Sequence, residues 1–328
     1  MKRYLAIAVS IPFVLIAWSY VYNSFQEAIP PEAMATSEDG FTRFIAMGDG
    51  GDGSVVQHAV SRAVEGVCEE NGCDFVLYLG DNIYTDGAAS PTDPLFQSRF
   101  EEPYANLDLP FYVVLGNHDY GANSAKFWRG QYEVDYTEHS DKWNMPSSYY
   151  TFRYGDVQFF GLDTNALMWG LGGSQAAWFS REVEASEARW RVAFGHHPYR
   201  SNGRHGNAGD YEGFSNIPVV SGNAIKRFFD GRLCGEVDLY LCGHDHNRQW
   251  IDGGCIDEPG DGLNTELIVS GSAAKLTRLR DRGNPVHFAN DESAGFVWLE
   301  MSADEFTAVF YDVEGQEEFR RVVERQER

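Results

Sequence analysis

Five short apolar runs in this sequence each end in a glycine that is followed at once by an aspartate, an asparagine or a histidine. They are Met47-Gly48-Asp49, Leu79-Gly80-Asp81, Leu115-Gly116-Asn117, Phe194-Gly195-His196 and Cys242-Gly243-His244. Such runs are typical of buried strands, and glycine lets the backbone turn closely where a strand ends. In open α/β sheets the carboxyl ends of the strands share one crevice. We therefore expect the five polar side chains to meet at one edge of a sheet.

From residue 41 onwards, apolar runs alternate with polar or amphipathic stretches. The runs are 41–47, 74–79, 111–115, 157–162, 190–194, 237–242 and 266–270. Residues 59–67 and 173–188 have helical character between strands, and 296–301 with 306–313 predict a closing β-hairpin. This alternation predicts an α/β domain with buried strands.

The amino terminus predicts a membrane anchor or an export signal. Lys2 and Arg3 precede the uncharged segment 4–26, which as a helix would reach roughly 30 Å, enough to cross a bilayer core. The basic flank would stay cytoplasmic, so the body is expected on the periplasmic or extracellular face, anchored or secreted. We interpret 1–26 as the anchor or signal, 27–40 as a tether and 41–313 as the catalytic domain. The charged segment 314–328 is interpreted as a solvated tail or a final strand.

The cysteines fit an exported chain. Cys68 and Cys73 bracket a short turn that allows a local pair, and Cys234 and Cys255 flank a strand and the loop that follows it, but the connectivity stays open. Cys242 lies inside an apolar run and is expected to be a buried free thiol.

The charge balance excludes one class of partner. Lys plus Arg total 26 against 49 Asp plus Glu, a net charge of -23. Such a surface repels phosphate backbones, so we expect no nucleic-acid partner. An anionic substrate must therefore meet a local positive site.

The residues that follow the strands offer the donor atoms of a metal centre. The candidate ligands are Asp49, Asp81, Tyr84, Asn117, His196, His244 and His246. Carboxylate, amide oxygen and imidazole donors together suit iron, manganese or zinc better than calcium. Seven ligands exceed what one ion takes while keeping an open position, so two ions sharing a bridging carboxylate fit better. In extended backbone, His244 and His246 would project from one face and serve neighbouring ions.

These blocks, in this order, resemble the calcineurin-like metallophosphoesterase superfamily, and within it the purple acid phosphatases of the tartrate-resistant type. The resemblance covers roughly 41–313 and includes the stretches 142–147 and 241–249. Many superfamily members carry a histidine where this chain has Gly51, whereas here Tyr84 follows Asp81 by three residues. A tyrosinate in place of that imidazole is what the purple acid phosphatase pattern implies. The implied fold is a β-sandwich of two mixed sheets flanked by helices, in four αββα layers.

The resemblance also implies how the ligands divide. A first ion would be held by Asp49, Asp81, Tyr84 and His246, and a second by Asp81, Asn117, His196 and His244, with Asp81 bridging. The implied pair is Fe(III) with Fe(II), Zn(II) or Mn(II).

Two further histidines are implied as catalytic residues. His118 resembles the histidine that helps to bind the phosphoryl group and protonates the leaving oxygen; His205 looks like the other substrate-side histidine on a looser match. Histidine pKa values near 6.5 suit proton donation at mildly acidic pH. Two carboxylates and a tyrosinate against a trivalent and a divalent ion leave a charge of about +2. A water pKa lowered to about 7 or below makes metal-bound hydroxide the expected nucleophile.

Taken singly, each of these residues also has a structural explanation. An aspartate or asparagine after a strand can cap a helix or close a turn, and a tyrosine such as Tyr84 can simply pack. Asp119 and Asp245 are expected to orient neighbouring groups, and Asp163 to support a turn. Structural roles are expected for the histidines His58, His139, His197 and His287.

Three functions remain open at this stage. The first is a phosphomonoesterase, or acid phosphatase, acting on a small phosphorylated substrate. The alternatives are a phosphodiesterase acting on cyclic nucleotides or lipid headgroups, and an envelope protein that binds metal without turnover. The membrane would be a partner only through an uncleaved amino terminus, and the oligomeric state is open. The loop 200–221 differs in length and composition from the mammalian-like pattern of the family, so the substrate preference of the family is not carried over to this chain.

Overall fold

The computed structural model describes residues 33–34, 40–121, 126–213, 215, 220–255 and 263–326. Within them, two mixed sheets form the body. One has seven strands in the order β15-β14-β13-β2-β3-β4-β5, and the other has eight in the order β1-β6-β7-β8-β9-β11-β10-β12. The strands of the first sheet are β2 (Thr42–Met47), β3 (Phe75–Tyr78), β4 (Phe111–Val113), β5 (Trp143–Asn144), β13 (Gly295–Met301), β14 (Glu305–Asp312) and β15 (Glu317–Glu324). Those of the second are β1 (Ala33–Met34), β6 (Tyr150–Tyr154), β7 (Val157–Gly161), β8 (Trp190–Phe194), β9 (Leu239–Cys242), β10 (Arg248–Ile251), β11 (Glu266–Ser270) and β12 (Val286–Asn290).

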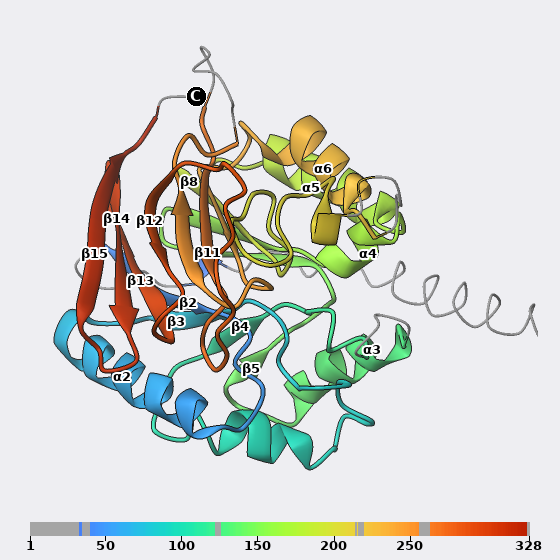
Figure 1. Ribbon diagram of the computed structural model, residues 1–328, viewed down its shortest axis with the longest axis vertical. Helices are drawn as coiled ribbons and strands as arrows, with labels where there is room; N and C mark the ends of the chain where they lie inside the picture. Colours follow the sequence, from blue (N-terminus) through green and yellow to red (C-terminus); the bar gives the residue numbers. More distant parts are fainter. Residues whose placement is uncertain are drawn as a thin grey trace, which may run out of the picture.

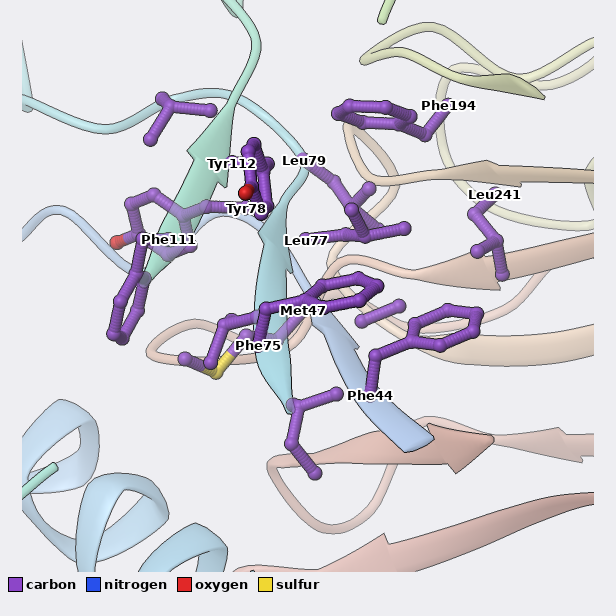
Figure 2. Packing of buried hydrophobic residues seen from close by; sticks show 14 of the residues in the cluster. Phe44, Met47, Phe75, Leu77, Tyr78, Leu79, Phe111, Tyr112, Phe194 and Leu241 are labelled. Carbon is purple, nitrogen blue, oxygen red and sulfur yellow. The ribbon is translucent and has the colours of Figure 1, made fainter. Parts of the chain in front are cut away.

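The two sheets pack face to face through an aromatic core. The ring of Phe159 on β7 lies 5.3 Å from the rings of both Phe44 on β2 and Phe75 on β3, edge to face. Figure 2 shows Phe194 and Leu241 of the eight-stranded sheet beside this cluster. Edge-to-face pairs at this separation add to the burial of apolar area, so the core fixes the two sheets relative to each other.

Helices cover the outer faces and complete the four layers (Figure 1). Helix α2 (Val55–Asn71) buries Val60 and Val64 against the seven-stranded sheet. It begins at Ser54, whose side chain accepts a hydrogen bond from the Gln57 backbone N–H. On the other side, α4 (Thr164–Met168), α5 (Gly173–Glu184) and α6 (Asn223–Phe228) pack over the eight-stranded sheet. The other helices of the described residues are α3 (Trp128–Asp135) and the short helices η1 (Gln97–Glu101), η2 (Tyr136–Glu138), η3 (Tyr211–Gly213) and η4 (Phe229–Leu233).

The predicted αββα sandwich is confirmed, and each of the seven apolar runs contains a strand. The predicted hairpin is β13 with β14, and the two predicted helices are α2 and α5. The charged segment after Gly315 takes the second of its two alternatives, because Glu317–Glu324 form the edge strand β15. The anchor or signal predicted for 1–26 lies outside the described residues. Among the described helices, none has the length and apolar character needed to span a bilayer.

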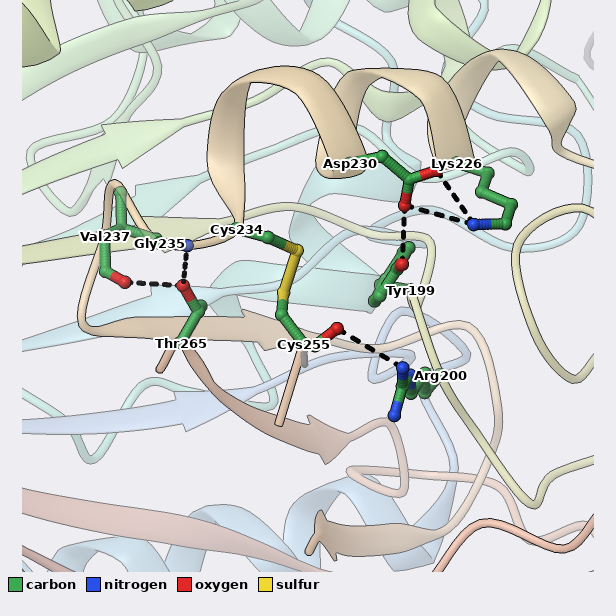
Figure 3. The surroundings of a disulfide bond; sticks show 9 residues. All are labelled: Tyr199, Arg200, Lys226, Asp230, Cys234, Gly235, Val237, Cys255 and Thr265. Carbon is green, nitrogen blue, oxygen red and sulfur yellow. Dashed lines mark hydrogen bonds and ion pairs between the residues drawn. A yellow bond between two sulfur atoms is a disulfide. The ribbon is translucent and has the colours of Figure 1, made fainter. Parts of the chain in front are cut away.

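Two disulfides are present, Cys68–Cys73, the local pair that the sequence allows, and Cys234–Cys255; Cys242 is the buried free thiol that was expected. Figure 3 shows the second bridge joining the chain before β9 to the chain after β10. The Arg200 side chain donates a hydrogen bond to the Cys255 carbonyl at 3.2 Å. The bridge therefore also supports the start of the 200–221 loop.

The five glycine-ended strands converge, but on the edges of two sheets rather than of one, which corrects the sequence expectation. β2, β3 and β4 belong to the seven-stranded sheet, and β8 and β9 to the eight-stranded sheet. Backbone hydrogen bonds join the two edges, because Gly48 N–H donates to the Ser270 carbonyl and Ala273 N–H donates to the Gly48 carbonyl. The polar residues after the strands thus face one another across the sandwich.

Candidate metal centre

A first group of donor atoms comes from the ends of β2, β3 and β9. The Tyr84 hydroxyl lies 3.1 Å from Oδ1 of Asp49 and 3.2 Å from Nε2 of His246. His246 Nε2 lies 3.4 Å from the same carboxylate oxygen. Asp49 is fully buried and Tyr84 is 4% exposed. Three donors of different chemistry therefore form a triangle, in which Asp49 and Tyr84 are buried and His246 is partly exposed.

A second group comes from the ends of β4, β8 and β9. Nε2 of His196 lies 3.0 Å from Oδ1 of Asn117 and 3.0 Å from Nδ1 of His244. The other ring nitrogen of His196 is 2.9 Å from the Leu79 carbonyl, which fixes the orientation of the ring.

Asp81 lies between the two groups. Its Oδ1 is 3.5 Å from Nε2 of His196 in the second group. Ligand oxygens or nitrogens of Asp49, Asp81 and His246 lie within 4.8 Å of one another in the first group. Two ligand atoms held at right angles about 2.1 Å from one ion lie about 3 Å apart. The spacing within each group and the donor chemistry therefore fit two ions that share Asp81.

Three candidate ligands have left-handed backbone conformations. The φ angles are 61° at Asp49, 56° at Asp81 and 68° at His244. Such conformations cost about 1–3 kcal/mol each and gather at functional sites. The expectation that His244 and His246 project from extended backbone is wrong, because the chain bends between β9 and β10. Their rings nevertheless reach the two different donor groups.

The pKa values reflect burial and crowded charges. Burial raises the pKa of Tyr84 well above its usual value, and Asp49 and Asp81 raise it further. Burial opposes ionisation of Asp81, but His196 and His118 outweigh it and lower the pKa of that carboxyl. Burial and the surrounding histidines hold the pKa of His244 well below normal, which keeps the imidazole neutral as metal binding requires.

The predicted catalytic residue His118 lies against the bridging candidate. Its backbone N–H donates to Oδ1 of Asp81 at 2.9 Å, and its Nε2 lies 3.9 Å from Oδ2. Nδ1 lies 2.6 Å from the Thr85 carbonyl. The side chain is 26% exposed, so it is open to a substrate.

His205 lies beside the second donor group, with its ring centroid 4.0 Å from that of His244. Its Nδ1 pairs with the Glu212 carboxylate. Its backbone N–H donates to Oδ1 of Asp245 at 2.8 Å, so Asp245 orients the loop as expected. Arg282 donates to the Gly203 carbonyl and holds the loop from the other side.

The supporting roles expected for aspartates agree with the structure. The Asp119 carboxylate accepts backbone N–H bonds from Asn82, Ile83 and Gly116, which fixes the turns after β3 and β4. Asp163 caps α4 and accepts from the Tyr120 hydroxyl. His197 is buried, with a ring nitrogen 2.8 Å from the Thr164 hydroxyl.

Sequence reasoning missed three residues. Lys275 lies over the Tyr84 ring, Glu212 pairs with His205, and the buried Glu133 accepts from Asn82 Nδ2 at 2.9 Å. Burial lowers the pKa of Lys275 against the opposing pull of Asp52 and the candidate ligands. One signal was available for Lys275, because the apolar run 266–270 also ends at a glycine. No such signal marks Glu212 or Glu133.

The structure explains why Gly51 is not a histidine. A Cβ atom at this position would overlap with the Asn82 carbonyl. The Gly51 carbonyl in turn accepts from the Tyr84 backbone N–H at 2.9 Å. The segment that carries Asn82 and Tyr84 thus lies so close to Gly51 that it excludes a side chain there, and it brings Tyr84 beside Gly51.

Residues 42–248 match the family model described as calcineurin-like phosphoesterase. The chain belongs to this family. Curated relatives include the tartrate-resistant acid phosphatase type 5 of Sus scrofa, 27% identical over 332 residues, covering 89% of this chain and 90% of the relative. The Homo sapiens protein of the same name is 28% identical, and the match covers 88% of this chain and 94% of the relative. Purple acid phosphatase 3 of Arabidopsis thaliana is 29% identical, covering 84% and 76%.

Solved structures agree on the fold. The structure titled "GAP50 the anchor in the inner membrane complex of Plasmodium" matches with a TM-score of 0.66 at 21% identity, covering 88% of this chain and 90% of that one. A structure of PhoD matches with a TM-score of 0.57 at 16% identity, covering 90% and 70%. By family membership and relatives, the chain is a metal-dependent phosphoric ester hydrolase.

Proposed function

We propose that this chain is an acid phosphatase that hydrolyses phosphate monoesters at a dinuclear metal centre. The observation that carries the proposal is the division of seven donor residues into two groups joined by Asp81. Acid phosphatases among the relatives, at 27–29% identity, support the same reading.

The residues would divide the work as follows. One ion would be held by Asp49, Tyr84 and His246. The other ion would be held by Asn117, His196 and His244. The carboxylate of Asp81 would bind both ions. The ions would supply Lewis acidity and lower the pKa of a bound water, the source of the nucleophile. A phenol among the ligands favours Fe(III) at the first position, with Fe(II), Zn(II) or Mn(II) at the second.

The two histidines would act on the substrate. His118, partly exposed beside Asp81, would bind the phosphoryl group and donate a proton to the leaving alcohol. His205, held by Glu212 and Asp245, would contact the substrate from the other group. No serine or cysteine nucleophile is required in this scheme.

We also propose that the chain acts outside the cytoplasm. The two disulfides fit an exported protein. The amino-terminal anchor or signal at 1–26 and the tether at 27–40 are part of the same proposal.

A metal analysis combined with a phosphoester panel tests the function. The purified full chain should contain two ions and hydrolyse p-nitrophenyl phosphate at mildly acidic pH, but not bis(p-nitrophenyl) phosphate. Hydrolysis of the bis-ester alone would favour the phosphodiesterase. A metal-replete chain that is inert to every ester would favour a metal-binding protein without turnover.

A further inference from the structure

A lysine lies directly over the face of the tyrosine in the candidate metal centre. The ammonium nitrogen of Lys275 is 3.1 Å from the centroid of the Tyr84 ring. The ring itself is almost fully buried, and the lysine is partly buried. An exposed lysine ordinarily keeps its ammonium group in water, so this placement needs a cause.

The cause lies in the segment that follows β11. Gly271 N–H donates to the Asn247 carbonyl, Ala273 N–H to the Gly48 carbonyl, and Thr277 N–H to the His246 carbonyl. The backbone on both sides of Lys275 is thereby attached to the loops that carry Asp49 and His246. The loops that position two candidate ligands therefore also position the lysine.

The surroundings of Tyr84 give this cation a specific effect. The phenol oxygen faces Asp49 and His246, and the ring of His118 lies 4.6 Å from the Tyr84 ring. A cation over an aromatic face is attracted by the ring quadrupole. The attraction is larger when the ring carries the negative charge of a phenolate, because a charge–charge term is added in a buried place.

We propose that Lys275 is a positioning residue that holds Tyr84 and stabilises its phenolate form as a metal ligand. This inference rests on the proposed function. Because the ammonium lies over the ring face, it lowers the energy of the phenolate electrons. It therefore widens the energy gap between the filled tyrosinate orbital and the Fe(III) orbital that accepts the electron in the charge-transfer transition. Removing the positive charge should narrow that gap and move the visible band to longer wavelength.

The test compares the visible spectra of iron-loaded full-length variants, with iron content measured in each. Tyr84→Phe should abolish the band and so establish its origin. Lys275→Met should move the band to longer wavelength, whereas Lys275→Arg, which keeps the charge, should stay close to wild type. Lys226→Met is the matched control, because Lys226 pairs with Asp230 on the outer helices. It should leave the spectrum unchanged.

The outcomes separate this inference from the proposed function. An iron-loaded wild-type protein without the band contradicts the tyrosinate ligand and the role of Lys275 together. A wild-type band that is lost in Tyr84→Phe but unmoved in Lys275→Met overturns the role of Lys275 alone. Should Lys275→Met fail to fold, Lys275→Gln removes the charge while keeping a polar side chain and gives the same comparison.

Discussion

Nε2 of His196 lies 3.0 Å from Nδ1 of His244, although the two histidines follow different strands, β8 and β9. Oδ1 of Asn117 also lies 3.0 Å from Nε2 of His196, and Asn117 follows β4, a strand of the other sheet. Two sheets thus contribute to one donor group, and the sandwich has to be assembled before that group exists. We therefore expect metal affinity to be linked to folding of the sandwich.

Replacing His196 should remove one ion and leave the other. His196→Ala deletes a central donor of the second group, while Asp49, Tyr84 and His246 remain. The metal content of the full chain should fall from about two ions to about one, because in the proposed division each group holds its own ion. His139→Ala, at an exposed position, is the control and should retain both. Retention of both ions in His196→Ala would contradict the division of ligands.

Replacing His118 should affect substrates according to their leaving groups. His118→Asn should lower kcat for alkyl phosphates by about 10²–10⁴-fold, because a poor leaving group needs a proton donor. The loss should be smaller for p-nitrophenyl phosphate, whose leaving group departs as an anion. Steady-state kinetics with His58→Asn on α2 as the control provide the measurement. An equal loss on both substrates would argue for a binding role only.

A side chain at Gly51 should damage the centre. Gly51→Ala forces the Asn82 carbonyl away, next to Asp81, and should lower the free energy of unfolding by about 1–3 kcal/mol. Metal content should fall with it. The control is Gly66→Ala on α2, where a Cβ meets nothing within 4 Å and stability should rise by roughly 0.5–1 kcal/mol. Chemical denaturation of both variants checks the prediction, which fails if Gly51→Ala is as stable as wild type.

The buried Glu133 predicts a pH dependence of stability. Burial raises its pKa from 4.5 to about 7. The folded state therefore binds this proton more tightly than the unfolded state. The contribution of the protonated Glu133 carboxyl to the free energy of unfolding is complete below about pH 4.5, and it is lost as the pH rises through about 7.

Glu133→Gln is neutral at every pH and should flatten this part of the profile. Relative to wild type, the variant should gain on the order of 1–3 kcal/mol between pH 4.5 and 8. Unfolding free energies at saturating metal across this range give the comparison. Parallel profiles for the two proteins would show that Glu133 does not titrate there.

Local sequence predicted the strands that contain an apolar run, and it missed polar strands such as β10. β3 and β9 are buried along their whole length and lead into Gly80 and Gly243, so pattern alone located them. β10 begins with Arg248 and Gln249, which are fully buried because distant groups bind them, including the Tyr311 carbonyl and the Ser201 hydroxyl. The charged edge strand β15 has the composition of a solvated tail, which is why both alternatives stayed open.

The same limit applies to the site. The candidate ligands follow strands and could be found from that position. Lys275 and Glu212 gain their roles through contact with Tyr84 and His205, which are distant in sequence or lie across a loop. Which strand ends belong to which sheet is also a matter of long-range pairing. The sequence pattern therefore led to one edge where the structure has two facing ones.

The decisive measurement for a pair of ions bridged by Asp81 is anomalous diffraction from crystals of the full chain, recorded at the absorption edges of iron, zinc and manganese. We expect two peaks about 3.5–4 Å apart, with the Asp81 carboxylate between them and the Tyr84 oxygen beside the iron peak. A single peak, or peaks away from Asp81, would contradict this expectation.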